Sequence, residues 1–178
     1  MTDVRDAASK FSDRSSPEGA ESLAEPGADD IRRGMAASEF EPFFQPIVSL
    51  ADGRVVGFEA LARWRSAERG LVPPIEFVGV AEQSDLIRAI DTVILERAWR
   101  QLDAALDACP YPEVNAVLSV NLSASHFIDS AIVERVQALL AEGRGRASRL
   151  QFEITETLLI NNTEAAEEIL GRLKALGV

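Results

Sequence analysis

The stretch Gly57–Trp64 places an acidic and a basic side chain on one face of a predicted strand. Because successive side chains of a strand point to opposite faces, Glu59, Leu61 and Arg63 share one face and apolar residues take the other. Burying a carboxylate costs several kcal/mol unless a metal or another cation offsets it. The pattern therefore favours a strand that lines a ligand site, with a structural Glu59–Arg63 ion pair as the alternative.

Two further predicted strands repeat this polar face. In the strand 116–122, Ser119 and Asn121 alternate with apolar residues, and Glu153 does the same in the strand 150–155. Strands of an α/β protein are usually apolar on both faces. Repeated polar side chains toward the carboxyl ends of such strands therefore indicate the mouth of a ligand site.

Glu59, Asn121 and Glu153 carry the oxygen donors that a hard divalent cation such as Mg²⁺, Mn²⁺ or Ca²⁺ prefers. Arg63 lies further along the same face as Glu59, where its guanidinium can hold a phosphate oxygen. The single histidine, His126, follows the strand 116–122, and its neighbours favour a loop turning into a helix over a general base.

Alternating strands and helices must position these side chains. After a short helix over 29–35, the expected elements are strands at 43–50 and 55–64, helices at 75–83 and from Asp85 to about Leu106, a strand at 116–122, a helix around 132–140, a strand at 150–155 and a last helix after Thr163. The first two strands form a hairpin, and the alternation that follows implies parallel strands with crossover helices, as in a (β/α) barrel or an open sheet. Because a complete barrel normally takes about 250 residues, we expect part of one.

Composition indicates one globular domain after a flexible start. The chain has 178 residues, of which 47% are hydrophobic and 26% charged. Residues 1–28 are rich in Ser, Ala, Asp, Glu, Pro and Gly, which predicts a mobile tail or linker before a domain at 29–178. Cys109 has no partner for an internal disulfide, and no signal peptide or apolar membrane segment is evident, so we expect a cytoplasmic protein.

The net charge of −11 argues against binding to nucleic acid polymers or to anionic membrane surfaces. A phosphate-containing ligand would have to be held through divalent cations, which convert a carboxylate cluster into a site for anions.

Five motifs in order resemble those of the EAL family of bacterial cyclic di-GMP phosphodiesterases. They are Phe44-Gln45-Pro46-Ile47-Val48, Gly57 to Trp64, Pro74 with Phe77, Ser119-Val120-Asn121-Leu122-Ser123, and Glu153-Ile154-Thr155-Glu156. The resemblance covers roughly residues 31–178. It implies a TIM-like barrel whose first strand runs antiparallel to the others.

The resemblance also implies a reaction and residue roles. The family hydrolyses one phosphodiester of cyclic di-GMP to give linear pGpG, with a water activated between two metal ions, here Mg²⁺ or Mn²⁺. By similarity, Glu59, Asn121 and Glu153 bind metal, Arg63 holds a phosphate, Gln45 and Leu61 line the guanine and ribose pocket, and Glu156 steadies a loop near the metals.

The sequence departs from the family at its end. The family's Asp-Asp-Phe-Gly-Thr-Gly motif, which supplies bridging carboxylates, would follow Val178. We therefore expect a truncated domain that does not hydrolyse cyclic di-GMP by itself. The alternative is a protein that binds cyclic di-GMP or a partner without catalysis. Unpaired strand edges also predict a homodimer, and a longer parent would have an upstream sensory domain.

Overall fold

The computed structural model describes residues 25–109, 116–142, 146–154 and 163–178. The chain order is α1 (Ala28–Ala36), β1 (Phe40–Val48), β2 (Val55–Ser66), β3 (Gly70–Val72), α2 (Pro74–Gln83), α3 (Ile87–Asp107), β4 (Val117–Leu122), the 3₁₀ helix η3 (Ala124–Phe127), α4 (Ala131–Glu142), the 3₁₀ helix η4 (Ala147–Arg149), β5 (Leu150–Ile154) and α6 (Thr163–Ala175). None of the helices in these ranges is long and apolar enough to cross a membrane.

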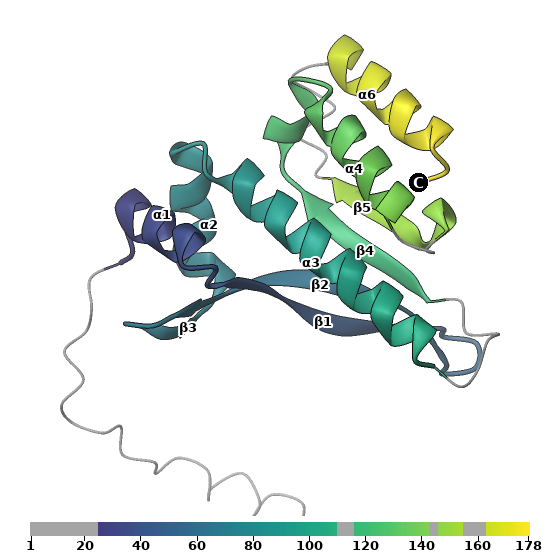
Figure 1. Ribbon diagram of the computed structural model, residues 1–178, viewed down its shortest axis with the longest axis horizontal. Coiled ribbons are helices and arrows are strands. Elements are labelled where there is room, and N and C mark those ends of the chain that lie inside the picture. The colour runs from purple at the N-terminus through teal and green to yellow at the C-terminus, as the bar shows by residue number, and fades with distance from the viewer. Residues whose placement is uncertain (1–24, 110–115, 143–145, 155–162) are drawn as a thin grey trace, which may run out of the picture.

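One mixed sheet organises the domain, with strand order β1-β2-β4-β5 and β3 paired to the end of β2 (Figure 1). β1 and β2 form the predicted antiparallel hairpin, whose turn is closed by the N–H of Ser49 bonding to the carbonyl of Arg54 at 2.8 Å. Gly53 takes the left-handed conformation in that turn, with φ of +70°. β2, β4 and β5 are parallel, which confirms the α/β class and the antiparallel first strand.

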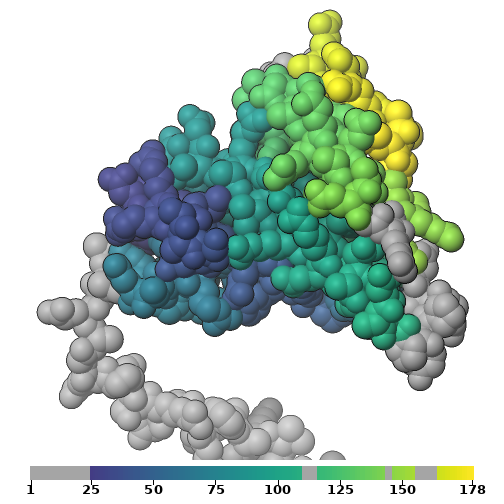
Figure 2. Space-filling view, in the orientation of Figure 1, coloured from purple at the N-terminus to yellow at the C-terminus, as the bar shows by residue number. Residues whose placement is uncertain are grey.

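Helix α3 packs across β1, β2 and β4, with α4 and α6 farther along the chain toward β5 (Figures 1 and 2). Trp64 is central to this side of the sheet. Its ring stacks on Phe40 at 5.3 Å between centroids and meets Phe77 edge to face at 6.2 Å. Trp64 of β2 and Trp99 of α3 are 2% and 3% exposed, so both tryptophans belong to the buried core.

Several element boundaries differ from the sequence prediction by one to three residues. The long helix begins at Ile87 and not at Asp85, because Asp85 takes a left-handed backbone conformation with φ of +58°. β1 begins at Phe40, three residues before the predicted start. The short strand β3 was not predicted, since its three residues leave almost no periodic pattern.

Gly57 of β2 lies beside Val117 of β4 with no room for a side chain. A Cβ atom at this position would lie 2.5 Å from the carbonyl oxygen of Val117. We expect Gly57→Ala to lower the free energy of unfolding by about 1–3 kcal/mol, because the two strands must separate to admit the methyl group. Urea unfolding followed by tryptophan fluorescence measures the effect.

Gly79→Ala is the matched control, since a Cβ there meets no atom within 4 Å and Gly79 lies inside α2. This substitution should stabilise the domain by up to about 1 kcal/mol. Equal unfolding midpoints for the two variants would contradict the role assigned to Gly57.

Candidate functional site

The polar side chains predicted on three strands lie on one face of the sheet. The register pairs Glu59 of β2 with Gln45 of β1 on one side and with Ser119 of β4 on the other. In the next pair of strands, β4 and β5, Asn121 lies beside Glu153. Since paired residues share a face, the register brings the predicted metal ligands of β2, β4 and β5 together.

Each of the two carboxylates accepts a hydrogen bond from a side chain of β4. The Asn121 Nδ2 donates to Glu59 Oε1 at 2.9 Å, and the Ser119 hydroxyl donates to Glu153 Oε1 at 2.5 Å. Ser119 is completely buried. The sequence pattern placed Ser119 on the polar face without assigning it a role. In the structure its hydroxyl orients Glu153.

The donor set fits a hard divalent cation. Asn121 uses its amide nitrogen toward Glu59, and among the described residues its Oδ1 accepts no hydrogen bond, so this oxygen is available to an ion. Glu59 and Glu153 add carboxylate oxygens. Within the described ranges, no group of three or more His, Cys, Asp or Glu side chains has the geometry of a metal site, so an amide is needed to complete the set of three.

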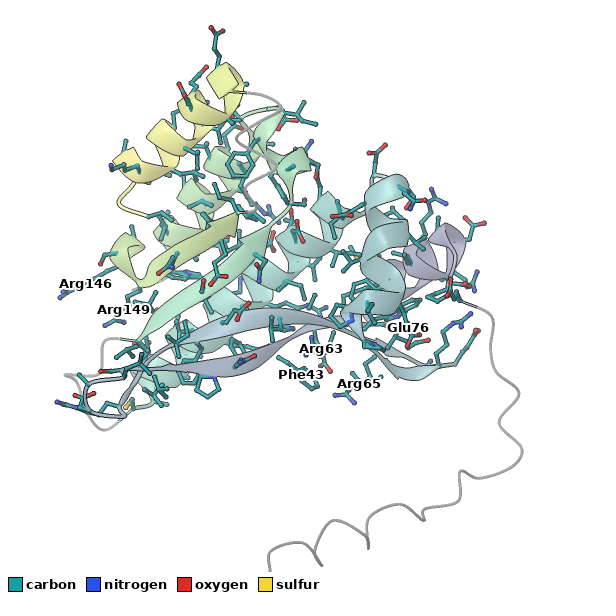
Figure 3. The ribbon with its side chains drawn as sticks, turned by 180° about the vertical axis from the view of Figure 1, so that it is seen from behind. Phe43, Arg63, Arg65, Glu76, Arg146 and Arg149 are labelled. Carbon is teal, nitrogen blue, oxygen red and sulfur yellow. The ribbon has the colours of Figure 1, made fainter. Side chains whose placement is uncertain are left out.

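Arg63 is directed to an aromatic ring and not to Glu59. Its guanidinium donates to the carbonyl of Ala62 at 2.8 Å and lies 5.6 Å from the centre of the Phe43 ring. Arg65 lies 6.0 Å from the same ring. Figure 3, seen from behind the view of Figure 1, labels Phe43 with both arginines nearby. No ion pair joins Arg63 to Glu59 in the described part of the chain, so the alternative of a structural pair is not observed.

A cavity of about 270 Å³ lies beside these side chains, between the carboxyl ends of β2 and β4 and the helices α2 and α3. Its lining is mostly apolar, and Leu61, Asn121 and Glu153 contribute to it. Gln45 lies outside this lining, exposed on β1 opposite Glu59. Glu156 lies outside the described residues, so its predicted role stays a prediction.

Comparisons with known proteins agree with the five motifs. The EAL domain family model matches residues 28–178. An uncharacterized signaling protein of Caulobacter vibrioides is 40% identical over 151 residues, covering 85% of this chain and 18% of that protein. The cyclic di-GMP phosphodiesterase NbdA of Pseudomonas aeruginosa is 34% identical over 150 residues, covering 84% and 19%. This chain thus spans about a fifth of the length of these relatives.

The fold agrees as well. The solved structure of the PaMucR phosphodiesterase in complex with c-di-GMP superposes with a TM-score of 0.76 at 32% identity, covering 84% of this chain and 60% of that one. EAL domains are TIM-barrel-like, which confirms the predicted type of α/β fold. Phosphodiesterases of this kind are metal-dependent, in keeping with the oxygen donors of the site. Because the family model extends over residues 28–178 and the strand register assembles the motif residues on one face, the chain belongs to the EAL domain family.

Proposed function

We propose that this chain binds cyclic di-GMP through a divalent metal ion and supplies part of the set of residues that hydrolyses cyclic di-GMP to linear pGpG. The observation that carries the proposal is the assembly of Glu59, Asn121 and Glu153 on one sheet face. Membership of a family that includes cyclic di-GMP phosphodiesterases supports the choice of substrate.

Charge makes the metal necessary for this ligand. Two carboxylates on the sheet face, in a chain of net charge −11, repel a dinucleotide with two phosphates. Mg²⁺ or Mn²⁺ held by these carboxylates would neutralise the local charge, polarise a phosphoryl oxygen and make a bound water more acidic. The chain's own contribution is to hold the ion between β2, β4 and β5 and to place the phosphate against it.

The remaining predicted residues of β1 and β2 are assigned to the nucleotide. We assign Arg63 to a phosphate of the nucleotide, because a guanidinium pairs well with phosphate oxygens. Leu61 and Gln45, on the same face of β2 and β1, are assigned to the guanine and ribose. A second copy of the chain or a sensory domain as partner, and Glu156 near the metals, remain predictions.

Binding without hydrolysis is the second candidate function. Catalysis by two metal ions uses bridging carboxylates, and the described residues bring together two carboxylates and one amide. This donor set is sufficient for one cation and favours ligand binding over catalysis by these residues alone.

Chromatography of cyclic di-GMP incubated with the purified chain and Mg²⁺ or Mn²⁺ separates the two candidates. We expect binding without turnover from this chain alone. Formation of pGpG that is lost in Glu59→Gln would establish catalysis by it. Absence of both binding and product would refute the proposed function.

Glu59→Gln should weaken Mn²⁺ binding by about tenfold or more, because it removes one anionic ligand while keeping an oxygen that can accept from Asn121. Electron paramagnetic resonance of free Mn²⁺ measures the dissociation constant. Glu41→Gln is the control, since Glu41 lies on the neighbouring strand and pairs with Arg65 at 2.7 Å. Equal losses in the two variants would contradict a metal site at Glu59.

Arg63→Ala should lower the affinity for cyclic di-GMP by about 10- to 100-fold, which corresponds to loss of a charged hydrogen bond of about 1.5–3 kcal/mol. Isothermal titration in the presence of Mn²⁺ measures it. Arg65→Ala removes a guanidinium that contacts the same Phe43 ring and should change the affinity by about twofold or less, because exposed charges are well screened. A larger loss in the Arg65 variant would overturn the assignment of Arg63.

A further inference from the structure

A carboxylate of α3 holds the backbone directly after β4. Asp91 Oδ2 accepts the N–H of Ser123 at 3.0 Å. Ser123 follows the last residue of β4 and lies two residues beyond Asn121. Asp91, Ser123 and Asn121 all line the cavity beside the candidate metal site. The contact therefore links the main core helix to the end of the strand that carries a predicted metal ligand.

The same carboxylate is enclosed by the 3₁₀ helix that follows. The Asp91 side chain is 14% exposed, and the Nε2 of buried His126 lies 3.4 Å from its Oδ2. Among the described residues, this His126 nitrogen has no partner with hydrogen-bond geometry, so the N–H of Ser123 is the group that directs the carboxylate. A half-buried carboxylate is costly to keep for packing alone.

An ion pair also ties this segment to α3. Arg88 donates to both oxygens of Asp129 at 2.9 and 3.1 Å, and Asp129 also accepts the N–H of Ala131. These hydrogen bonds, those from Arg88 above all, hold the pKa of Asp129 below its ordinary value. The Arg88–Asp129 pair is solvent-exposed and lies beyond η3, so it fixes the far end of the segment and leaves the end near Asn121 to Asp91.

We propose that Asp91 is a positioning residue for the candidate metal site. By accepting the Ser123 N–H it fixes the carboxyl end of β4, and this fixes the direction of the Asn121 amide between Glu59 and the cation. Metal ligands depend on such outer contacts, whose loss typically costs about 10- to 100-fold in metal affinity. The presence of a metal ion in this inference rests on the proposed function. The way in which Asp91 acts rests on the geometry at the end of β4.

The test compares three variants of the full chain, with Mn²⁺ as the probe. Asp91→Ala should weaken Mn²⁺ binding by about tenfold. Asp91→Asn should stay within about threefold of the unsubstituted chain, because the side-chain Oδ1 of asparagine still accepts the Ser123 N–H. Asp129→Ala, which removes the other tether, should leave Mn²⁺ affinity within about twofold even where it lowers the melting temperature.

Nuclear magnetic resonance supplies a readout that needs no metal. In Asp91→Ala, hydrogen exchange at the Ser123 amide should accelerate and the Asn121 side-chain NH₂ signals should shift, as the bond to Glu59 is disturbed. Asp129→Ala should change neither. If Asp91→Ala does not fold, Asp91→Glu, which displaces the carboxylate by one methylene, should show the same changes.

Two results would overturn the inference. One is unchanged Asn121 signals in a variant whose Ser123 amide has become exposed to exchange. The other is a loss of Mn²⁺ affinity in Asp91→Asn as large as in Asp91→Ala, which would make the charge and not the hydrogen bond responsible. If the unsubstituted chain binds no Mn²⁺, the proposed function fails, and the Asn121 signals still decide whether Asp91 positions this side chain.

Discussion

The register between β2, β4 and β5 is the constraint on which the site depends. It pairs Glu59 with Ser119 and Asn121 with Glu153, so that residues 60 and 32 positions apart in sequence become neighbours. Because side chains alternate along a strand, a slip of one residue would turn one member of each pair toward the helices. The close approach of Gly57 to Val117 favours this register two residues before Glu59 and Ser119.

The helix-covered side of the sheet stabilises that register. α3 packs on β1, β2 and β4, and Arg97 of this helix donates to the carbonyls of Ser38 and Phe40 at the start of β1. The same helix reaches the end of β4 through Asp91. α3 thus contacts β2, which carries Glu59, and also the two strands that flank it, β1 and β4. Packing on the helix-covered face of the sheet in this way determines side-chain positions on the opposite face.

The sequence predicted what depends on local periodicity. The side-chain alternation around Glu59 and Asn121 was correct because a strand has only two faces. The hydrogen bond from Ser119 to Glu153 was not predicted, because it depends on which strands become neighbours and in which register. The left-handed Asp85 and the contact of Asp91 were missed for the same kind of reason, since both reflect how α3 packs against distant residues. The Glu156 prediction lies outside the described residues.

The partners of the two carboxylates indicate why this face suits a cation. Glu59 and Glu153 are held by an amide and a hydroxyl, both neutral, and neither forms an ion pair within the described residues. Neutral donors orient a carboxylate without cancelling its charge. Arg63, the nearest candidate on the same strand face, is instead held over Phe43. Had Arg63 paired with Glu59, only the charge of Glu153 would be left for a cation. Because Arg63 is held apart from the carboxylates, their negative charge is left for a metal ion and its guanidinium is left for a phosphate. These two groups match the positive metal and the negative phosphate of a metal–phosphate complex.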